Sequence, residues 1–160
     1  MADDNKIKLA NETYQTLLRA IELNEWKCTR HDEDLTITFG VSGDDLDMDF
    51  IVKVDAERQL VRLLSQLPVN FVTGGKLMEG AIATSVANYS LADGSFDYDI
   101  LKGNVYFRMT TSYRSSVISP DALRYMINCA AYTVDKFNDQ LLLVSNGAMS
   151  ISEFIEKFDN

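Results

Sequence analysis

The sequence has few of the residues that most often build catalytic or metal-binding sites. Its 160 residues include one histidine, His31, and two cysteines, Cys28 and Cys129. Histidine is the commonest general base and zinc ligand, so a single copy disfavours both kinds of site. The two cysteines show no CxxC spacing. We expect two reduced thiols, although a disulfide between them is the alternative.

Positive charge is also scarce, with 15 Lys and Arg against 24 Asp and Glu and a formal net charge of −9. Nucleic acids and anionic membranes both attract basic surfaces, so neither is expected as a partner. No segment approaches the ~20 apolar residues of a membrane span. The N-terminal sequence MADDNKIK is acidic, unlike a signal peptide. We therefore expect a cytoplasmic protein.

Only two prolines are present, and there is no linker-like or low-complexity segment. Hydrophobic residues make up 46% of the chain, which is typical of a globular protein. A chain of this length can bury a sufficient core without disulfides. We expect one domain covering residues 1–160.

Apolar residues recur at spacings of three and four in three segments, which predicts helices over about 5–24, 75–90 and 120–137. Ser150 and Glu153 form a capping-box pattern that predicts a short terminal helix over 151–158. Thr73 is the expected cap of the second helix. Its expected buried stripe is Leu77, Met78, Ala81, Ile82, Val86 and Tyr89.

Alternating apolar and polar residues predict strands over 35–41, 46–54, 96–100 and 105–109. Residues 59–66, which are apolar on both faces, are expected to form a further strand after the second of these, which makes five. The expected order is therefore α-β-β-β-α-β-β-α plus a short C-terminal helix. Each strand has an apolar face and each main helix an apolar stripe. We expect an α+β fold in which a single antiparallel five-stranded sheet carries the helices on one face.

The other face of that sheet is mixed in character, with apolar residues among aspartates and arginines. A loop at 110–116, rich in hydroxyls, follows the last strand; it suits an anion or acidic segment, or is only a polar connection. We expect partner binding at eight residues of this face and loop: Ile51, Leu60, Arg62, Leu64, Tyr106, Arg108, Tyr113 and Arg114.

Three patterns imitate chemical motifs but lack essential residues. The aspartates of residues 45–49 match the start of a calcium loop, without its required glycine and glutamate. Asp97 and Asp99 have a spacing that suits some acid–base pairs, yet solvated strand residues are commoner. Residues 74–76 lack the upstream glycine and the following Ser or Thr of a phosphate loop. We expect no catalytic residues, metal or cofactor.

Two long segments resemble the YbjN family, described as bacterial sensory transduction regulators. They are FIVKVDAERQLVRLLSQLPV at 50–69 and VANYSLADGSFDYDILKGNVYFRMTTSYRSS at 86–116. Thr133, Asp135 and Phe137 fit a further pattern of that family. The resemblance implies a type III secretion chaperone-like fold with the element order given above. It implies no catalytic residue and no cofactor.

These observations favour a non-enzymatic protein-binding module, chaperone-like or regulatory. Its protein partner is not identified by the sequence, and a second copy of the chain, forming a homodimer, is one candidate. The alternative is a small-ligand or effector sensor that uses Tyr106, Arg108, Tyr113 and Arg114. An enzyme stays open as a third hypothesis, because spatial convergence of side chains is not visible in a sequence.

Overall fold

The helical and extended patterns fold into four α-helices and six strands across residues 3–158, the part of the chain that the computed structural model describes. The helices are α1 (Asp4–Leu23), α2 (Leu77–Tyr89), α3 (Pro120–Ser145) and α4 (Ile151–Phe158). The strands are β1 (Thr29–His31), β2 (Thr36–Ser42), β3 (Asp47–Asp55), β4 (Leu60–Asn70), β5 (Ser95–Asp99) and β6 (Asn104–Ser112). A short 3₁₀ helix, η1 (Asp32–Asp34), joins β1 to β2.

The strands form one antiparallel sheet in the order β1-β2-β3-β4-β6-β5. The expected antiparallel sheet is confirmed, but it has six strands rather than five. The additional strand is β1, which precedes the first predicted strand and in which His31 pairs with Thr36. Thr29 and Arg30 are exposed, so β1 is held by backbone pairing and carries no apolar alternation that would reveal it.

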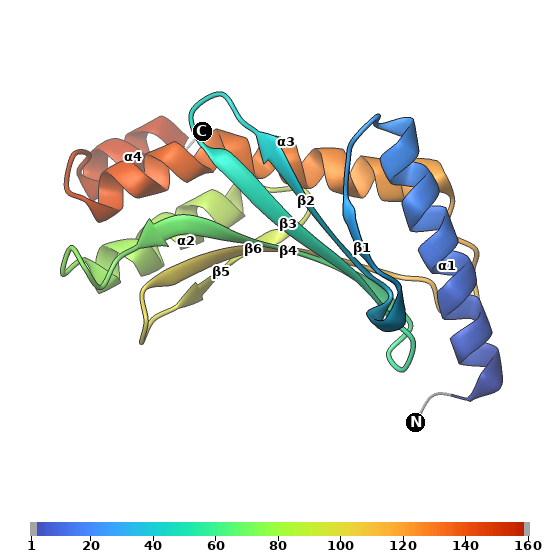
Figure 1. Cartoon of the computed structure of the whole chain (residues 1–160). Coiled ribbons are helices and arrows are strands. Elements are labelled where there is room, and N and C mark those ends of the chain that lie inside the picture. Colours follow the sequence, from blue (N-terminus) through green and yellow to red (C-terminus); the bar gives the residue numbers. More distant parts are fainter. Residues whose placement is uncertain (1–2, 159–160) are drawn as a thin grey trace.

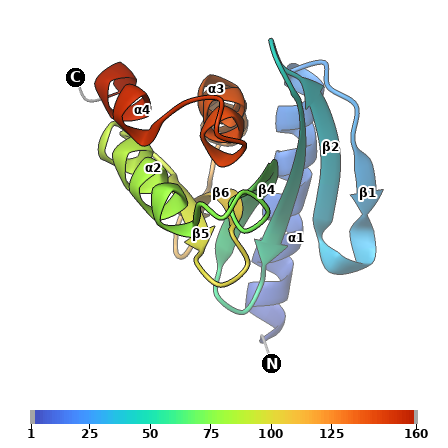
Figure 2. The same cartoon turned by 90° about the vertical axis from the view of Figure 1, so that its left-hand side faces the viewer.

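The four helices pack on one face of this sheet (Figures 1 and 2). The core residues of β3, β4 and β6 alternate with exposed ones, as the period of a half-buried strand requires. Phe137 of α3 links the layers, because its ring lies 5.4 Å from that of Phe96 in β5 and 4.7 Å from that of Phe158 in α4. No helix of the described residues lies over the other face of the sheet.

The third and fourth helices begin where their sequences predicted. The Ser119 side chain accepts a hydrogen bond from the Ala122 N–H. Ser150 and Glu153 cap one another reciprocally at the start of α4. The third helix is longer than expected and continues past Phe137 to Ser145, since residues 138–145 continue the same apolar stripe.

The second helix presents the opposite face to the core from the expected one. Its buried residues are the small ones, Gly80, Ala83, Thr84 and Ala87. Its exposed residues include Met78, Ile82 and Tyr89, which were expected to be buried. A Cβ on Gly80 would lie 2.6 Å from the Tyr98 hydroxyl oxygen, so small residues permit the close approach to β5. The expected cap was also wrong, because the helix begins at Leu77, beyond Thr73.

Candidate functional site

The face of the sheet that lies away from the helices is open to solvent, and we call it the open face. The strand register places Ile51 directly opposite Leu64, and Leu64 directly opposite Arg108. Ile51 is 47% exposed and Leu64 is 37% exposed. Two large apolar side chains therefore lie side by side in water at the centre of this face. The open face comprises Asp47, Asp49, Ile51, Lys53, Leu60, Arg62, Leu64, Gln66, Tyr106 and Arg108.

Two hollows flank the Ile51–Leu64 pair. The larger measures about 450 Å³ and is lined by Asp47, Asp49, Ile51, Leu64, Gln66, Leu67, Pro68 and Tyr106. The smaller measures about 230 Å³ and is lined by Ile51, Lys53, Arg62, Leu63, Leu64 and Arg108. Both are depressions that open onto the surface of the sheet. Because Ile51 and Leu64 border both hollows, the two hollows are adjacent and form one surface with the apolar pair between them.

The larger hollow exists because β3 and β4 pair over only part of their length. Their register runs from Ile51 opposite Leu64 to Asp55 opposite Leu60. Beyond the Ile51–Leu64 end of this pairing, residues 47–50 of β3 pair only with β2. Residues 65–70 of β4 lie beside β6 alone, with an irregular register. Figure 1 shows the two strands diverging toward the β2–β3 turn. We call this opening the β3–β4 split.

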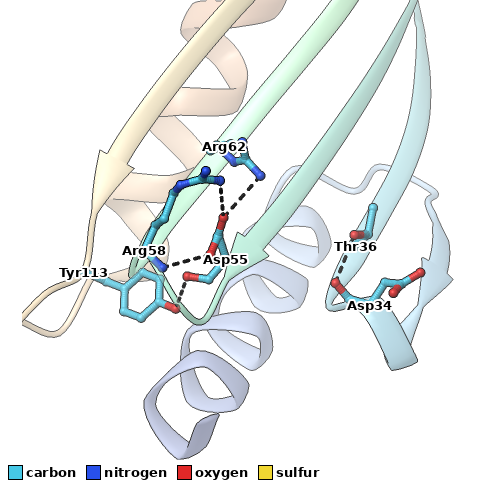
Figure 3. A network of polar contacts seen from close by, with 6 residues as sticks. All are labelled: Asp34, Thr36, Asp55, Arg58, Arg62 and Tyr113. Atoms are coloured by element: carbon cyan, nitrogen blue, oxygen red, sulfur yellow. Dashed lines mark hydrogen bonds and ion pairs between the residues drawn. The ribbon is translucent and has the colours of Figure 1, made fainter. Parts of the chain in front are cut away.

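The arginines of the open face are each held by a carboxylate. Arg108 forms a bidentate pair with Asp97, at 2.6 Å from Nε to Oδ2 and 3.1 Å from Nη2 to Oδ1. Arg62 Nη2 lies 3.2 Å from Asp55 Oδ2, which Arg58 also approaches (Figure 3). These contacts fix both guanidinium groups in place and neutralise much of their charge.

Asp55 is the anchor of the second network. The backbone N–H of Arg58, supported by the guanidinium groups of Arg62 and Arg58, holds the pKa of the Asp55 carboxyl below its ordinary value. Its backbone oxygen accepts a hydrogen bond of 2.8 Å from the Tyr113 hydroxyl, as Figure 3 shows. The Nε of Arg62 is buried and has no hydrogen-bond partner among residues 3–158.

Two aspartates of the open face are not paired in this way. Asp47 and Asp49 are exposed and border the larger hollow. Within the described part of the chain, neither carboxylate forms an ion pair. The region of the split is therefore acidic, while the Arg62 and Arg108 end of the face is nearly balanced.

The structure brings together five of the predicted residues and separates three. Ile51, Arg62, Leu64, Tyr106 and Arg108 line one or both hollows. Leu60 lies at the end of the open face, opposite Asp55, and lines neither hollow.

The residues of the loop after β6 lie apart from the hollows. Tyr113 belongs to the core, with no exposed surface, and burial is the main cause that raises its pKa to about 12. Its expected role in partner binding was therefore wrong, because its hydroxyl is used inside the protein. Arg114 is exposed beyond the end of β6 and borders neither hollow.

Sequence reasoning missed Gln66, Leu67 and Pro68. Leu67 and Pro68 lie beyond residue 66, where the third strand was expected to end, although β4 continues to Asn70. Pro68 carried a usable signal. Proline has no N–H to donate and is confined in sheets to strand edges and bulges. A proline inside an alternating pattern therefore indicates a strand that lacks a partner on one side or has an irregular register, as β4 does here.

Among residues 3–158, no group of three or more His, Cys, Asp or Glu side chains is arranged to hold a metal ion. None of the helices in that range combines the length and the apolar character needed to cross a membrane.

No protein-family model matches the chain, and no curated protein is similar to it at a significant level. Two solved chains share its fold. One belongs to the HopA1–SchA chaperone–effector complex, with a TM-score of 0.52 and 16% identity over 81% of this chain and 95% of that one. The other belongs to the ExsC–ExsE complex, with a TM-score of 0.55 and 15% identity over 89% and 97%. The chaperone-like fold is thus confirmed. At such identities, the likeness concerns the fold alone.

Proposed function

We propose that this chain is a non-enzymatic protein-binding module, chaperone-like or regulatory, that holds a partner protein on its open face. The observation that carries this proposal is the exposed Ile51–Leu64 pair between two hollows. Single exposed apolar residues are common, but two in directly opposite positions of neighbouring strands on an uncovered sheet face mark a surface suited to binding.

The comparisons support this proposal without identifying the partner. Both similar chains come from structures of complexes, one of which is a chaperone with an effector. A protein-binding role is compatible with the resemblance to the YbjN family, whose regulatory description we keep as part of the hypothesis.

The small-ligand alternative has less support. It relied on Tyr106, Arg108, Tyr113 and Arg114 lying around one site. Tyr113 is in the core, and Arg114 is away from the hollows. Arg108 is already held by Asp97, so the polar groups do not converge on an enclosed space.

The substitution Leu64→Glu tests the open face directly. It places a charge at the centre of the surface, where a desolvated apolar contact with a partner would be lost. The matched control is Val117→Glu, because Val117 is 91% exposed and lies off the sheet. Tagged protein would be purified from its own cells, and the co-purifying protein quantified for each variant.

We expect Leu64→Glu to lose the partner while keeping the unfolding midpoint within the range of the control. If both variants retain the same amount of the same partner, the open face is not the binding surface.

We further propose that a second copy of the chain pairs through the outer face of α2. Met78 is 65% exposed, Ile82 is 41% exposed and Tyr89 is 87% exposed, and their spacing places them along one side of the helix. A helix that is apolar all round is normally buried. This stripe carries no charge, and such a surface suits a two-fold contact in which each copy presents the same residues.

Sedimentation velocity distinguishes the two surfaces. We expect Ile82→Glu to convert a dimer to a monomer and Leu64→Glu to leave the dimer intact. A dimer that survives Ile82→Glu, or that dissociates in Leu64→Glu, would remove α2 as the pairing surface.

A further inference from the structure

The β3–β4 split leaves two strand edges without a partner. Among residues 3–158, no strand pairs with residues 47–50 of β3 or 65–70 of β4 on the sides that face each other. Unpaired strand edges are templates for pairing with another extended chain. The hollow of about 450 Å³ lies at this position.

The two edges are not equivalent. β4 contains Pro68, which cannot donate a hydrogen bond, and its register with β6 is irregular there. The edge of β3 contains no proline and is regularly paired with β2 on its other side. The turn before it is tied to α3, since the Asp44 N–H donates to Asp135 Oδ1 at 2.9 Å. The β3 edge is therefore the better formed template.

Charge and burial indicate which chain this edge would accept. Asp47 and Asp49 point to the open face, so a paired segment would place its own outward side chains next to them. Met48 and Phe50 point to the core, and Leu67 lines the inner side of the hollow. Cross-strand neighbours of opposite charge are favoured, and like charges are disfavoured. A basic strand would therefore bind more favourably next to Asp47 and Asp49 than a neutral or acidic strand.

We propose that the β3 edge at residues 47–50 binds an extended segment of the partner protein in which basic and apolar residues alternate. The basic residues lie beside Asp47 and Asp49 on the open face, and the apolar residues face inward toward Leu67. Backbone hydrogen bonds to β3 provide affinity, as in other cases of strand addition. This inference rests on the proposed function and specifies the chemistry of the partner.

A synthetic peptide of eight residues that alternates lysine and valine is the probe. The peptide is labelled with fluorescein, and its binding to the protein is measured by fluorescence anisotropy at low salt. The test variant is D47N/D49N, and the control is D44N/D45N, which removes the same charge from the turn outside the hollow. A second peptide of identical sequence carries N-methyl groups on alternate backbone nitrogens.

We expect D47N/D49N to weaken binding about tenfold, because two exposed charge pairs are lost, and D44N/D45N to change it less than about twofold. N-methylation should also weaken binding about tenfold if backbone pairing is used. Equal losses in both variants, tight binding of the N-methylated peptide, or no saturable binding at all would overturn the inference. A native partner that still depends on Leu64 would then show that the proposed function stands without it.

Discussion

Leu63 and Leu64 offer a test of the sheet with identical chemistry at adjacent positions. Leu63 has no exposed surface and lies between the sheet and the helices, whereas Leu64 is 37% exposed on the open face. Replacing each by alanine removes the same atoms. Only the environment of those atoms differs, so the two substitutions measure which face of β4 is the core.

We expect Leu63→Ala to lower the free energy of unfolding by about 3–4 kcal/mol, because the lost apolar burial is compounded by a cavity. Leu64→Ala should lower it by about 1 kcal/mol, since its side chain is partly in water and no closed cavity forms. With a urea dependence of about 2 kcal/mol per molar, the midpoints should fall by about 1.5–2 M and 0.5 M respectively.

Urea unfolding followed by far-UV circular dichroism and by the fluorescence of Trp26 provides the measurement. Trp26 is the only tryptophan in the sequence, and its ring lies 5.5 Å from that of Phe39. Similar midpoint shifts for the two variants would mean that the open face is covered in solution. A larger shift for Leu64→Ala would mean that the phase of β4 is reversed.

Three further predictions concern the core and its cooperativity. Gly80→Ala should destabilise the protein by about 1–3 kcal/mol in chemical denaturation, because the added Cβ would meet Tyr98 and Phe71. This loss should outweigh the higher helix propensity of alanine. A gain in stability would contradict the close packing of α2. Tyr113 has its pKa raised to about 12 by burial and by Asp55, so its contribution to stability is complete below pH 10 and is lost as the pH rises toward 12. Tyr113→Phe should therefore flatten the stability profile between pH 10 and 12, and an unchanged slope would contradict this. Far-UV circular dichroism and Trp26 fluorescence should report coincident unfolding transitions if residues 1–160 form one domain. Separate transitions would mean that the chain contains more than one independently unfolding unit.

Most of the fold was predictable, because in strands and helices with one apolar face the spacing of apolar residues along the sequence indicates the type of element. β3 is the clearest case, since Met48, Phe50, Val52 and Val54 alternate with exposed residues and are all buried. β1 was not predictable, because Thr29–His31 shows no apolar alternation and joins the sheet by backbone pairing with β2. α2 was predicted as a helix but with the wrong face, because its apolar residues surround it and the packing of Gly80 against Tyr98 decides the orientation.

The candidate site was predictable in part for a related reason. Strand alternation correctly placed Ile51 and Leu64 opposite the core, since a period of two fixes the side on which a residue lies. It gave no information on where two strands separate, and so the split was missed. The burial of Tyr113 was also missed, because a polar loop sequence does not show that one aromatic turns inward toward Asp55.

Site-specific photo-crosslinking in the protein's own cells can show whether a partner protein lies on the open face. A photoreactive residue at Gln66 would lie in the larger hollow, and one at Arg19 would lie on the exposed side of α1 as the control. We predict one dominant crosslinked protein from position 66, lost when Leu64→Glu is added, and no such product from position 19. Equal crosslinking from both positions, or a product at 66 that persists in the Leu64→Glu background, would mean that the partner does not bind the open face.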